Sequence, residues 1–332
     1  MSASEVIDVH AHAVLESSFG AAGAAGPELG TAADGSPFYR VGDYVLRGVR
    51  YAGTPFMDVQ VRLARMDAAG IDRQLLSPNP LTYFHDLPVP AAVAYCRRHN
   101  DGLAAVVAQH PDRFLGAAQL PVQSVSAAIA ELDRAVNDLG LVAPYISTDP
   151  CRPLDDPAMD DLYEAAVSLD VPVFVHPTSV GRHGPPDDER LRRFDLDLLF
   201  GFGYDETLAV AALVFGGVLE RHPQLDVCVS HGGGAIAYVA GRFSRAVTSG
   251  RPWVPSWLSD RGFDPLLRRL WLDTHVHSEQ SLSLLVAVVG TDRLVFGTNF
   301  AGWDDSGTHT VSEVGDLMPT LSRNARRLLR LD

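Results

Sequence analysis

Short runs of β-branched and other apolar residues alternate along the chain with longer stretches in which apolar residues recur at helical spacing. The pattern predicts eight strands: Val6–His10, Ile71–Ser77, Phe114–Leu120, Leu141–Ile146, Val171–His176, Leu225–Ser230, Leu270–Thr274 and Leu294–Thr298. It predicts helices at Asp58–Ala69, Pro90–Gln109, Ser124–Leu139, Pro157–Leu169, Asp205–Arg221, Gly234–Val247, Glu279–Val289 and Val311–Leu329. Eight strand–helix units in 332 residues favour a (β/α)8 TIM barrel. The alternative is an open doubly wound sheet, but no glycine-rich dinucleotide fingerprint follows the first strand.

We expect a single barrel domain over residues 1–332, because no break in composition interrupts the pattern. Two connections, at about residues 13–57 and 177–203, are longer than ordinary loops between a strand and a helix. Both leave the carboxyl ends of predicted strands, where barrel enzymes build their active sites. We therefore expect these loops to cover a substrate pocket, with mobile decoration as the alternative.

Charge and composition exclude several classes of protein. The net charge is −14, which disfavours binding to nucleic acid, and all 27 basic residues are arginine. Without lysine there can be no Schiff-base lysine, no carbamylated lysine bridging two metals and no Walker-type phosphate site. Three scattered cysteines fit a reducing compartment, and no uncharged apolar run is long enough to span a membrane. We expect a cytoplasmic enzyme that acts on a small molecule.

Histidines, and in one case an asparagine, stand at the ends of several predicted strands. His10 and His12 end the first strand, and their alternate spacing puts both side chains on one face. His176 ends the fifth strand, His231 the sixth, and Asn299 the eighth. These side chains would meet at one mouth of a barrel, where imidazole is a common ligand for zinc, iron and similar ions.

With these motifs the chain resembles the amidohydrolase superfamily, in the branch related to aminocarboxymuconate-semialdehyde decarboxylase. The resemblance covers nearly the whole chain. By resemblance His10, His12 and His176 are metal ligands, and His231 polarises or protonates the reacting centre. Arg242 corresponds to an arginine that binds a substrate carboxylate, often across the interface of a homodimer. The motifs that carry the resemblance are Ile-Asp-Val-His-Ala-His (7–12), Arg-Met-Asp-Ala-Ala-Gly-Ile (65–71), His-Pro-Asp-Arg-Phe-Leu-Gly (110–116), Val-Phe-Val-His-Pro (173–177), Val-Ser-His-Gly-Gly-Gly (229–234) and Val-Gly-Thr-Asp-Arg-Leu-Val-Phe-Gly-Thr (289–298).

The chain departs from the family pattern after the eighth strand. The family has an aspartate that ligates the metal and handles a proton, and this chain has Asn299. An amide oxygen can bind a metal but cannot accept a proton or carry charge. Three alternatives stay open: Asn299 is a neutral ligand, the site is impaired, or another residue replaces the carboxylate. Asp304 and Asp305 are candidates for that replacement, with Asp304 as a catalytic base.

A second His-x-His follows the seventh strand, at His275 and His277, with Asp273 in phase with both. We expect His275 to be an extra metal ligand that permits a rearranged or binuclear site, with a packing role as the alternative. Glycines 232–234 would allow tight packing beside His231, and their N–H groups are candidates for an oxyanion hole.

These residues predict a metal-dependent hydrolase of an amide, ester or thioester. A divalent ion, either zinc or one to two ions of iron or manganese, would activate water for attack on the carbonyl carbon. The first alternative is non-oxidative decarboxylation of an aromatic or dienoic acid. Two further alternatives are a binuclear iron or manganese oxygenase and a non-catalytic supporting subunit.

Overall fold

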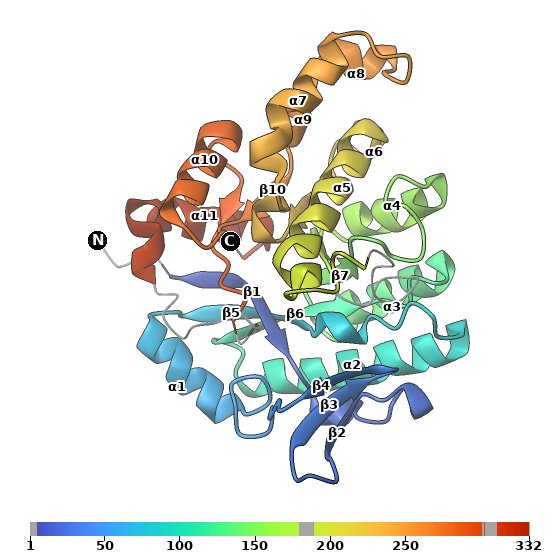
Figure 1. Cartoon of the computed structure of the whole chain (residues 1–332), viewed down its shortest axis with the longest axis vertical. Helices are drawn as coiled ribbons and strands as arrows, with labels where there is room; N and C mark the ends of the chain where they lie inside the picture. The colour runs from blue at the N-terminus through green and yellow to red at the C-terminus, as the bar shows by residue number, and fades with distance from the viewer. Residues whose placement is uncertain (1–4, 179–188, 301, 303–310, 332) are drawn as a thin grey trace.

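Eight parallel strands form a barrel in the computed structural model, which describes residues 5–178, 189–300, 302 and 311–331 (Figure 1). In sheet order they are β1 (Ile7–Ala13), β5 (Arg73–Pro78), β6 (Phe114–Gln119), β7 (Ala143–Ser147), β8 (Val173–His176), β9 (Val227–Val229), β10 (Trp271–Asp273) and β11 (Leu294–Val295). The ring closes where the N–H of Val9 donates to Phe296 O (2.9 Å) and the N–H of Phe300 donates to His10 O (3.1 Å). The predicted (β/α)8 barrel is confirmed, with each strand inside or within a few residues of its predicted range.

Helices surround the barrel and follow its strands (Figure 1). Asp58 and Ser124, the first residues of two predicted helices, are N-caps whose side chains accept hydrogen bonds from N–H groups of the first helical turn. The α-helices are α1 (Val59–Ala69), α2 (Val89–Gln109), α3 (Val125–Asn137), α4 (Asp160–Ser168), α5 (Phe202–Phe215), α6 (Val218–Arg221), α7 (Ile236–Thr248), α8 (Ser256–Arg261), α9 (Phe263–Leu267), α10 (Glu279–Val289) and α11 (Met318–Leu328). Short helical turns are η1 (Glu16–Ser18), η2 (Gly23–Ala25), η3 (Pro80–Thr82), η4 (Pro157–Met159), η6 (His231–Gly233) and η7 (Val311–Leu317), and η5 (Asp197–Gly201) is a π-helix.

The connection over residues 13–57 contains a small antiparallel sheet that the sequence reading missed. Its strands are β2 (Glu28–Thr31), β3 (Pro37–Val41) and β4 (Tyr44–Arg47), and it lies at one side of the barrel (Figure 1). Tyr39 and Val41 are buried in a local apolar cluster with Val14 and Tyr51. Two apolar runs flank Gly42-Asp43, a two-residue turn that signals a hairpin. This connection therefore contains regular secondary structure and is not an irregular loop.

One stretch of the described residues, Asp197–Phe215, is long and apolar enough to cross a membrane by length and composition alone. It comprises η5 and α5, and its Val210, Leu213 and Val214 are fully buried in the main core. The same helix carries Glu206, whose carboxylate is also fully buried. Only a third of the apolar stretch is buried, and Leu199, Phe200, Tyr204 and Leu208 are exposed, so packing against the barrel explains part of its apolar character.

Asn100 joins α2 to two neighbouring elements and is fully buried. Its Nδ2 donates to Gln119 O (2.9 Å) and to Glu131 Oε1 (2.7 Å), and its Oδ1 accepts from the N–H of Gln119 (2.9 Å). We expect Asn100→Ala to lower the free energy of unfolding by about 2–4 kcal/mol, because it leaves buried polar groups unpaired. Urea unfolding measures this loss.

The adjacent exposed residue provides the control. Asp101 pairs only at the surface with Arg134 (2.6 Å), so Asp101→Asn should cost less than about 1 kcal/mol. Equal losses of unfolding free energy in Asn100→Ala and Asp101→Asn would contradict the importance assigned to the buried hydrogen bonds of Asn100.

Candidate metal centre and active site

Four of the predicted site histidines meet at the carboxyl ends of the barrel strands. His10 and His12 come from β1, His176 ends β8, and His231 begins η6 directly after β9. Their ring centroids are 4.6 Å apart for His12 and His176, 4.9 Å for His10 and His176, and 4.8 Å for His10 and His231. The predicted convergence is therefore present.

Backbone carbonyls hold two of these rings in one tautomer. Nδ1 of His12 lies 3.0 Å from Pro78 O and 2.9 Å from the Ser77 hydroxyl, which itself donates to Ala11 O (3.2 Å), and Nδ1 of His176 lies 2.6 Å from Pro177 O. A carbonyl oxygen can only accept, so each Nδ1 carries the proton and each Nε2 presents a lone pair. The two Nε2 atoms are 3.2 Å apart. Two lone pairs at this distance repel each other unless a metal ion or a shared proton lies between them.

His10 completes the donor set. Its Nδ1 lies 2.7 Å from Asp273 Oδ2, so Nε2 is again directed away from the anchoring group. Ligand atoms of His10, His176 and His231 all lie within 4.8 Å of one another. Burial, followed by the nearby His12, His10 and His231, holds the pKa of His176 well below its ordinary value, so the ring is neutral. A neutral, nitrogen-rich cluster of this kind suits a divalent metal ion.

Asn299 lies beside these histidines, as its position after the last strand predicts. It is 3% exposed and lines a cavity of about 110 Å³ together with His12 and His176. Its backbone adopts a left-handed φ of 49°, a conformation that asparagine tolerates better than most residues. A Cβ at Gly302 would come within 2.4 Å of the Asn299 amide nitrogen, so this close approach requires glycine.

A buried carboxylate on α5 holds the fourth histidine. Nδ1 of His231 lies 2.7 Å from Glu206 Oε1, and the hydroxyl of Ser230 donates to the same oxygen. Glu206 is fully buried, and burial raises its pKa above the ordinary value despite the opposing effect of His231. The side chain of Glu206 therefore orients His231 from behind.

The glycine-rich turn after His231 packs tightly, as expected, but its N–H groups do not form an oxyanion hole. The N–H of Gly232 donates to Asp273 Oδ1 (3.3 Å). The N–H of Gly233 donates to Ser230 O (2.8 Å) and that of Gly234 to His231 O (3.1 Å). Because all three groups have acceptors within the protein, that part of the prediction is wrong.

Asp8 ties the strand that carries His10 to its two neighbours. Its carboxylate accepts from the N–H (3.1 Å) and hydroxyl (2.8 Å) of Thr298, from Gln74 Nε2 (2.9 Å) and from the N–H of His10 (3.1 Å). Oε1 of Gln74 in turn accepts from Nη1 of the buried Arg62 (2.9 Å). Burial raises the pKa of Asp8 to about 7, although these hydrogen bonds oppose the shift.

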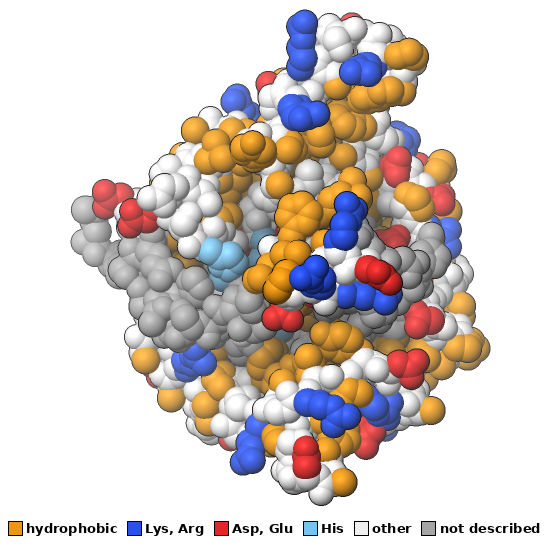
Figure 2. All heavy atoms as spheres, in the orientation of Figure 1, with side chains coloured by type: hydrophobic (Ala, Val, Ile, Leu, Met, Phe, Trp, Pro, Cys, Tyr) orange, Lys and Arg blue, Asp and Glu red, His pale blue; other side chains and the backbone are white. Residues whose placement is uncertain are grey.

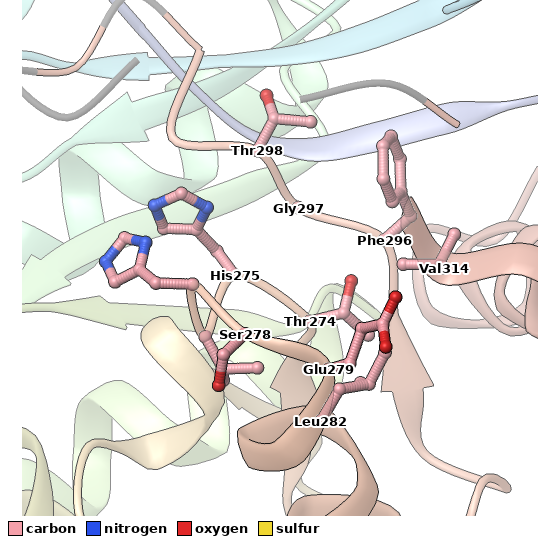
Figure 3. Close-up of a pocket in the computed structure, with 11 residues that line it drawn as sticks. Thr274, His275, Ser278, Glu279, Leu282, Phe296, Gly297, Thr298 and Val314 are labelled. Carbon is pink, nitrogen blue, oxygen red and sulfur yellow. The ribbon is translucent and has the colours of Figure 1, made fainter. Parts of the chain in front are cut away.

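His275 lies at the edge of the cluster. Its ring centroid is 6.0 Å from that of His10 and 5.6 Å from that of His231. It lines a cavity of about 290 Å³, where Figure 3 shows it near Gly297 and Thr298, and it also lines a cavity that contains Glu206 and His231. The group of His10, His176 and His231 ligand atoms within 4.8 Å includes neither His12 nor His275.

Arg242 and the clustered histidines line different cavities. Arg242 is exposed on α7 and lines a surface cavity with Arg245 and Arg251. Asp304 and Asp305 lie outside the described residues. Within this one chain, Arg242 has no position from which to bind a substrate at the histidines.

The 110 Å³ cavity has mainly apolar walls. Tyr44 and Leu46 from β4 line it together with Tyr51 and Phe56, all from the long connection after β1. Phe202 of α5 lines both this cavity and a neighbouring one of about 440 Å³, which also contains Glu206 and His231. Figure 2 shows histidine side chains at the surface with hydrophobic side chains near them. Within the 110 Å³ cavity, His12 and His176 form the polar end of a slot with aromatic walls.

A family model described as Amidohydrolase matches residues 7–331. The chain belongs to this amidohydrolase family. The resemblance drawn from the strand-end motifs is confirmed.

Relatives of this amidohydrolase-family chain include decarboxylases. It is 31% identical over 245 residues to 2-amino-3-carboxymuconate-6-semialdehyde decarboxylase of Dictyostelium discoideum, spanning 73% of this chain and 66% of that protein. It is 30% identical over 298 residues to gamma-resorcylate decarboxylase of Rhizobium radiobacter, spanning 83% and 88%. A solved 2,6-dihydroxybenzoate decarboxylase, complexed with 2,6-dihydroxybenzoate, superposes with a TM-score of 0.70 at 28% identity, covering 83% of this chain and 90% of that one.

These relatives correct the functional expectation. Their names describe removal of a carboxylate, whereas the sequence had favoured hydrolysis of an amide, ester or thioester. Asn299 in place of the family aspartate does not exclude decarboxylation, because the four histidines still lie together.

Sequence reasoning missed Glu206, Gln74 and Arg62, and it gave Asp8 no role. Glu206 carried one readable signal, because it is an acidic residue within the strongly apolar stretch 202–215. Gln74 and Arg62 belong to an ordinary strand and an ordinary helix, so only the folded barrel shows that they connect to Asp8.

Asp8 predicts a particular pH dependence of stability in the metal-free protein. Between about pH 4 and 7 the folded state keeps the Asp8 proton that the unfolded state releases, so stability falls as pH rises. The slope is at most about 1.4 kcal/mol per pH unit. We expect Asp8→Asn to remove this contribution, and urea unfolding at several pH values between 5 and about 7 in the presence of a chelator measures it.

An exposed carboxyl serves as the control for this measurement. Glu16→Gln should leave the pH dependence of the wild type unchanged, because Glu16 lies at the surface. Parallel curves for wild type and Asp8→Asn would contradict a raised pKa at Asp8.

Proposed function

We propose that this chain is a metal-dependent, non-oxidative decarboxylase of an aromatic carboxylic acid. The observation that carries the proposal is the convergence of the His10, His12 and His176 rings, two of which, His12 and His176, line a slot with aromatic walls. The decarboxylase relatives support the reaction class. His231, held by Glu206 beside this cluster, supplies the acid–base group that the reaction needs.

The cavity suits a planar ring with a polar end. Tyr51, Phe56 and Phe202 provide apolar surface, while the amides of Asn79 and Asn299 provide hydrogen-bonding groups. None of the described residues that line this cavity is an arginine. Neutralisation of a substrate carboxylate inside it therefore depends on the bound cation, which places the carboxylate at the histidines.

One divalent ion fits the donor set. His10, His12 and His176 would hold it, with the amide oxygen of Asn299 as a neutral fourth ligand. When bound, such an ion neutralises and orients an anionic substrate. Zinc, manganese and iron all accept ligands of this kind, so elemental analysis of the purified protein must identify the ion.

His231 performs the proton transfer. The protonated imidazole of His231 donates a proton to the carbon of the substrate's aromatic ring that bears the carboxylate. The bond from that carbon to the carboxylate then breaks, its electron pair returns to the aromatic ring, and CO2 leaves. One proton replaces one CO2, so no oxidant or reductant is consumed. The apolar walls limit access of water to the reacting carbon.

The finer features of the assembly stay predictions. A homodimer and a cytoplasmic location follow only from the resemblance and from composition. Arg242 lies on the exposed side of α7, so it can contribute to a substrate site only in a partner copy.

The reaction is tested with protein loaded with manganese, zinc or iron and supplied with 2,6-dihydroxybenzoate and related hydroxybenzoates. We expect CO2 release, and in D2O the product should carry deuterium at the carbon that lost the carboxylate. His231→Asn should lower kcat about 10²–10⁴-fold by removing the proton donor. His176→Ala should lose both metal and activity, because it removes a ligand.

A histidine outside the cluster provides the matched control. His110 follows α2, so His110→Ala should keep its metal and its activity. Full activity after chelation, or full activity of His231→Asn, would refute the proposed mechanism. Hydrolysis of a simple aryl ester without CO2 release would refute the reaction class.

Asn299 predicts an effect on metal affinity. We expect Asn299→Asp to lower the dissociation constant for manganese about tenfold or more, because a carboxylate adds charge to a neutral shell. Isothermal titration with the metal-free protein measures the constant. Asn79→Asp is the control, since it adds the same charge elsewhere in the cavity. An equal change in both variants would show that Asn299 is not a ligand.

A further inference from the structure

One carboxylate oxygen of Glu206 holds His231, although the two residues are 25 positions apart in the sequence. Oε1 accepts from Nδ1 of His231 at 2.7 Å and also from the hydroxyl of Ser230. Oε2 has no hydrogen-bond partner among the described residues, and the side chain is 0% exposed. A carboxylate buried this completely, with half of its acceptor capacity unused, is poorly explained as a structural contact.

The contact determines which ring nitrogen of His231 faces the cluster. An ionised carboxylate only accepts, so the proton of the neutral ring resides on Nδ1. Nε2 is then directed toward His10 and His176, whose ring centroids lie 4.8 and 5.1 Å from that of His231. Nε2 is the nitrogen that must take up and deliver the proton in the proposed reaction.

Close packing between α5 and the turn after His231 makes this contact possible. Gly234 has φ +67°, and a Cβ there would lie 2.1 Å from Gly203 O. One turn further along α5, the hydroxyl of Thr207 accepts from the N–H of Ala235 (2.9 Å). Gly203 and Thr207 thus clamp the helix on both sides of Glu206, which explains why a carboxylate on α5 reaches a ring at the end of β9.

We propose that Glu206 is the positioning residue of His231: it fixes the Nδ1–H tautomer and the ring orientation from which Nε2 transfers the proton. The role rests on the proposed decarboxylase function for its catalytic consequence. Its structural consequence, one fixed tautomer, holds whether or not that function is right. The negative charge of Glu206 also balances the ring whenever both of its nitrogens carry a proton.

The experiment compares Glu206→Ala and Glu206→Gln by two readouts. The first is the ¹⁵N shift of the His231 ring nitrogens in the metal-free protein, which distinguishes the two tautomers. The second is kcat and KM of the metal-loaded enzyme. Glutamine keeps an acceptor oxygen, whereas alanine removes it. Comparing the two variants therefore separates the orientation of the His231 ring by an acceptor oxygen from simple filling of the space by a side chain.

We expect Glu206→Ala to show mixed tautomers and a fall in kcat of about a hundredfold, with KM within about twofold of wild type. Glu206→Gln should retain the Nδ1–H tautomer and recover part of kcat. Asp205→Asn is the matched control, because Asp205 is the neighbouring carboxylate on α5 and does not contact His231. It should leave both readouts unchanged.

The wild-type tautomer in Glu206→Ala would overturn the proposal. An equal kcat loss in Glu206→Gln and Glu206→Ala, with the tautomer unchanged in both, would overturn it as well. If wild type releases no CO2 from any substrate, the proposed function fails, yet the tautomer measurement still decides the role of Glu206. If Glu206→Ala does not fold, the isosteric Glu206→Gln still tests the proposal. Both ring nitrogens at wild-type shifts, with kcat at least partly retained, support orientation through the acceptor oxygen, and a switch to the Nε2–H tautomer contradicts it.

Discussion

The carboxylate of Asp8 is the contact on which the geometry of the site depends. It joins β1 to the residues after β11 through Thr298 and to β5 through Gln74, at the point where the barrel closes. These hydrogen bonds fix the position of β1 between its two neighbouring strands, and with it the direction in which the side chains of His10 and His12 point. The carboxylate stays buried only because four donors surround it, and its raised pKa reflects the remaining cost of burial. Closure of the barrel and placement of His10 and His12 therefore depend on the same hydrogen bonds.

Each histidine of the cluster is anchored through its Nδ1 atom. His12 and His176 use backbone carbonyls, whereas His10 and His231 use the buried carboxylates of Asp273 and Glu206. Carbonyls fix a tautomer without adding charge, and carboxylates also stabilise positive charge on the ring. The difference separates the neutral pair, whose Nε2 atoms are 3.2 Å apart, from the two charge-assisted rings.

The site shows why strand-end motifs identify a metal centre more reliably than a reaction. Hydrolysis and decarboxylation both use a cation held by histidines, with an acid–base group beside it. The choice between them depends on what the cavity presents to substrate. Here Tyr44, Leu46, Tyr51 and Phe56 of the wall come from the folded segment 28–56, which contains no motif for any reaction. Asn299 drew attention to a missing charge, but it did not determine the chemistry.

The sequence by itself determined the barrel, its strands and the meeting of His10, His12, His176 and His231. It could do so because period-two and helical patterns are local, and because parallel strands in a barrel must end at one mouth. Only the tertiary structure decided that Glu206 supports His231, that Arg62 and Gln74 support Asp8, and that His275 stands at the edge. The hydrogen bonds of Glu206, Arg62 and Gln74 join residues that are 12 to 66 positions apart in the sequence. The hydrogen bond between Thr298 and Asp8 joins residues that are 290 positions apart. No local pattern encodes such a pairing, because it depends on the packing of one element against another.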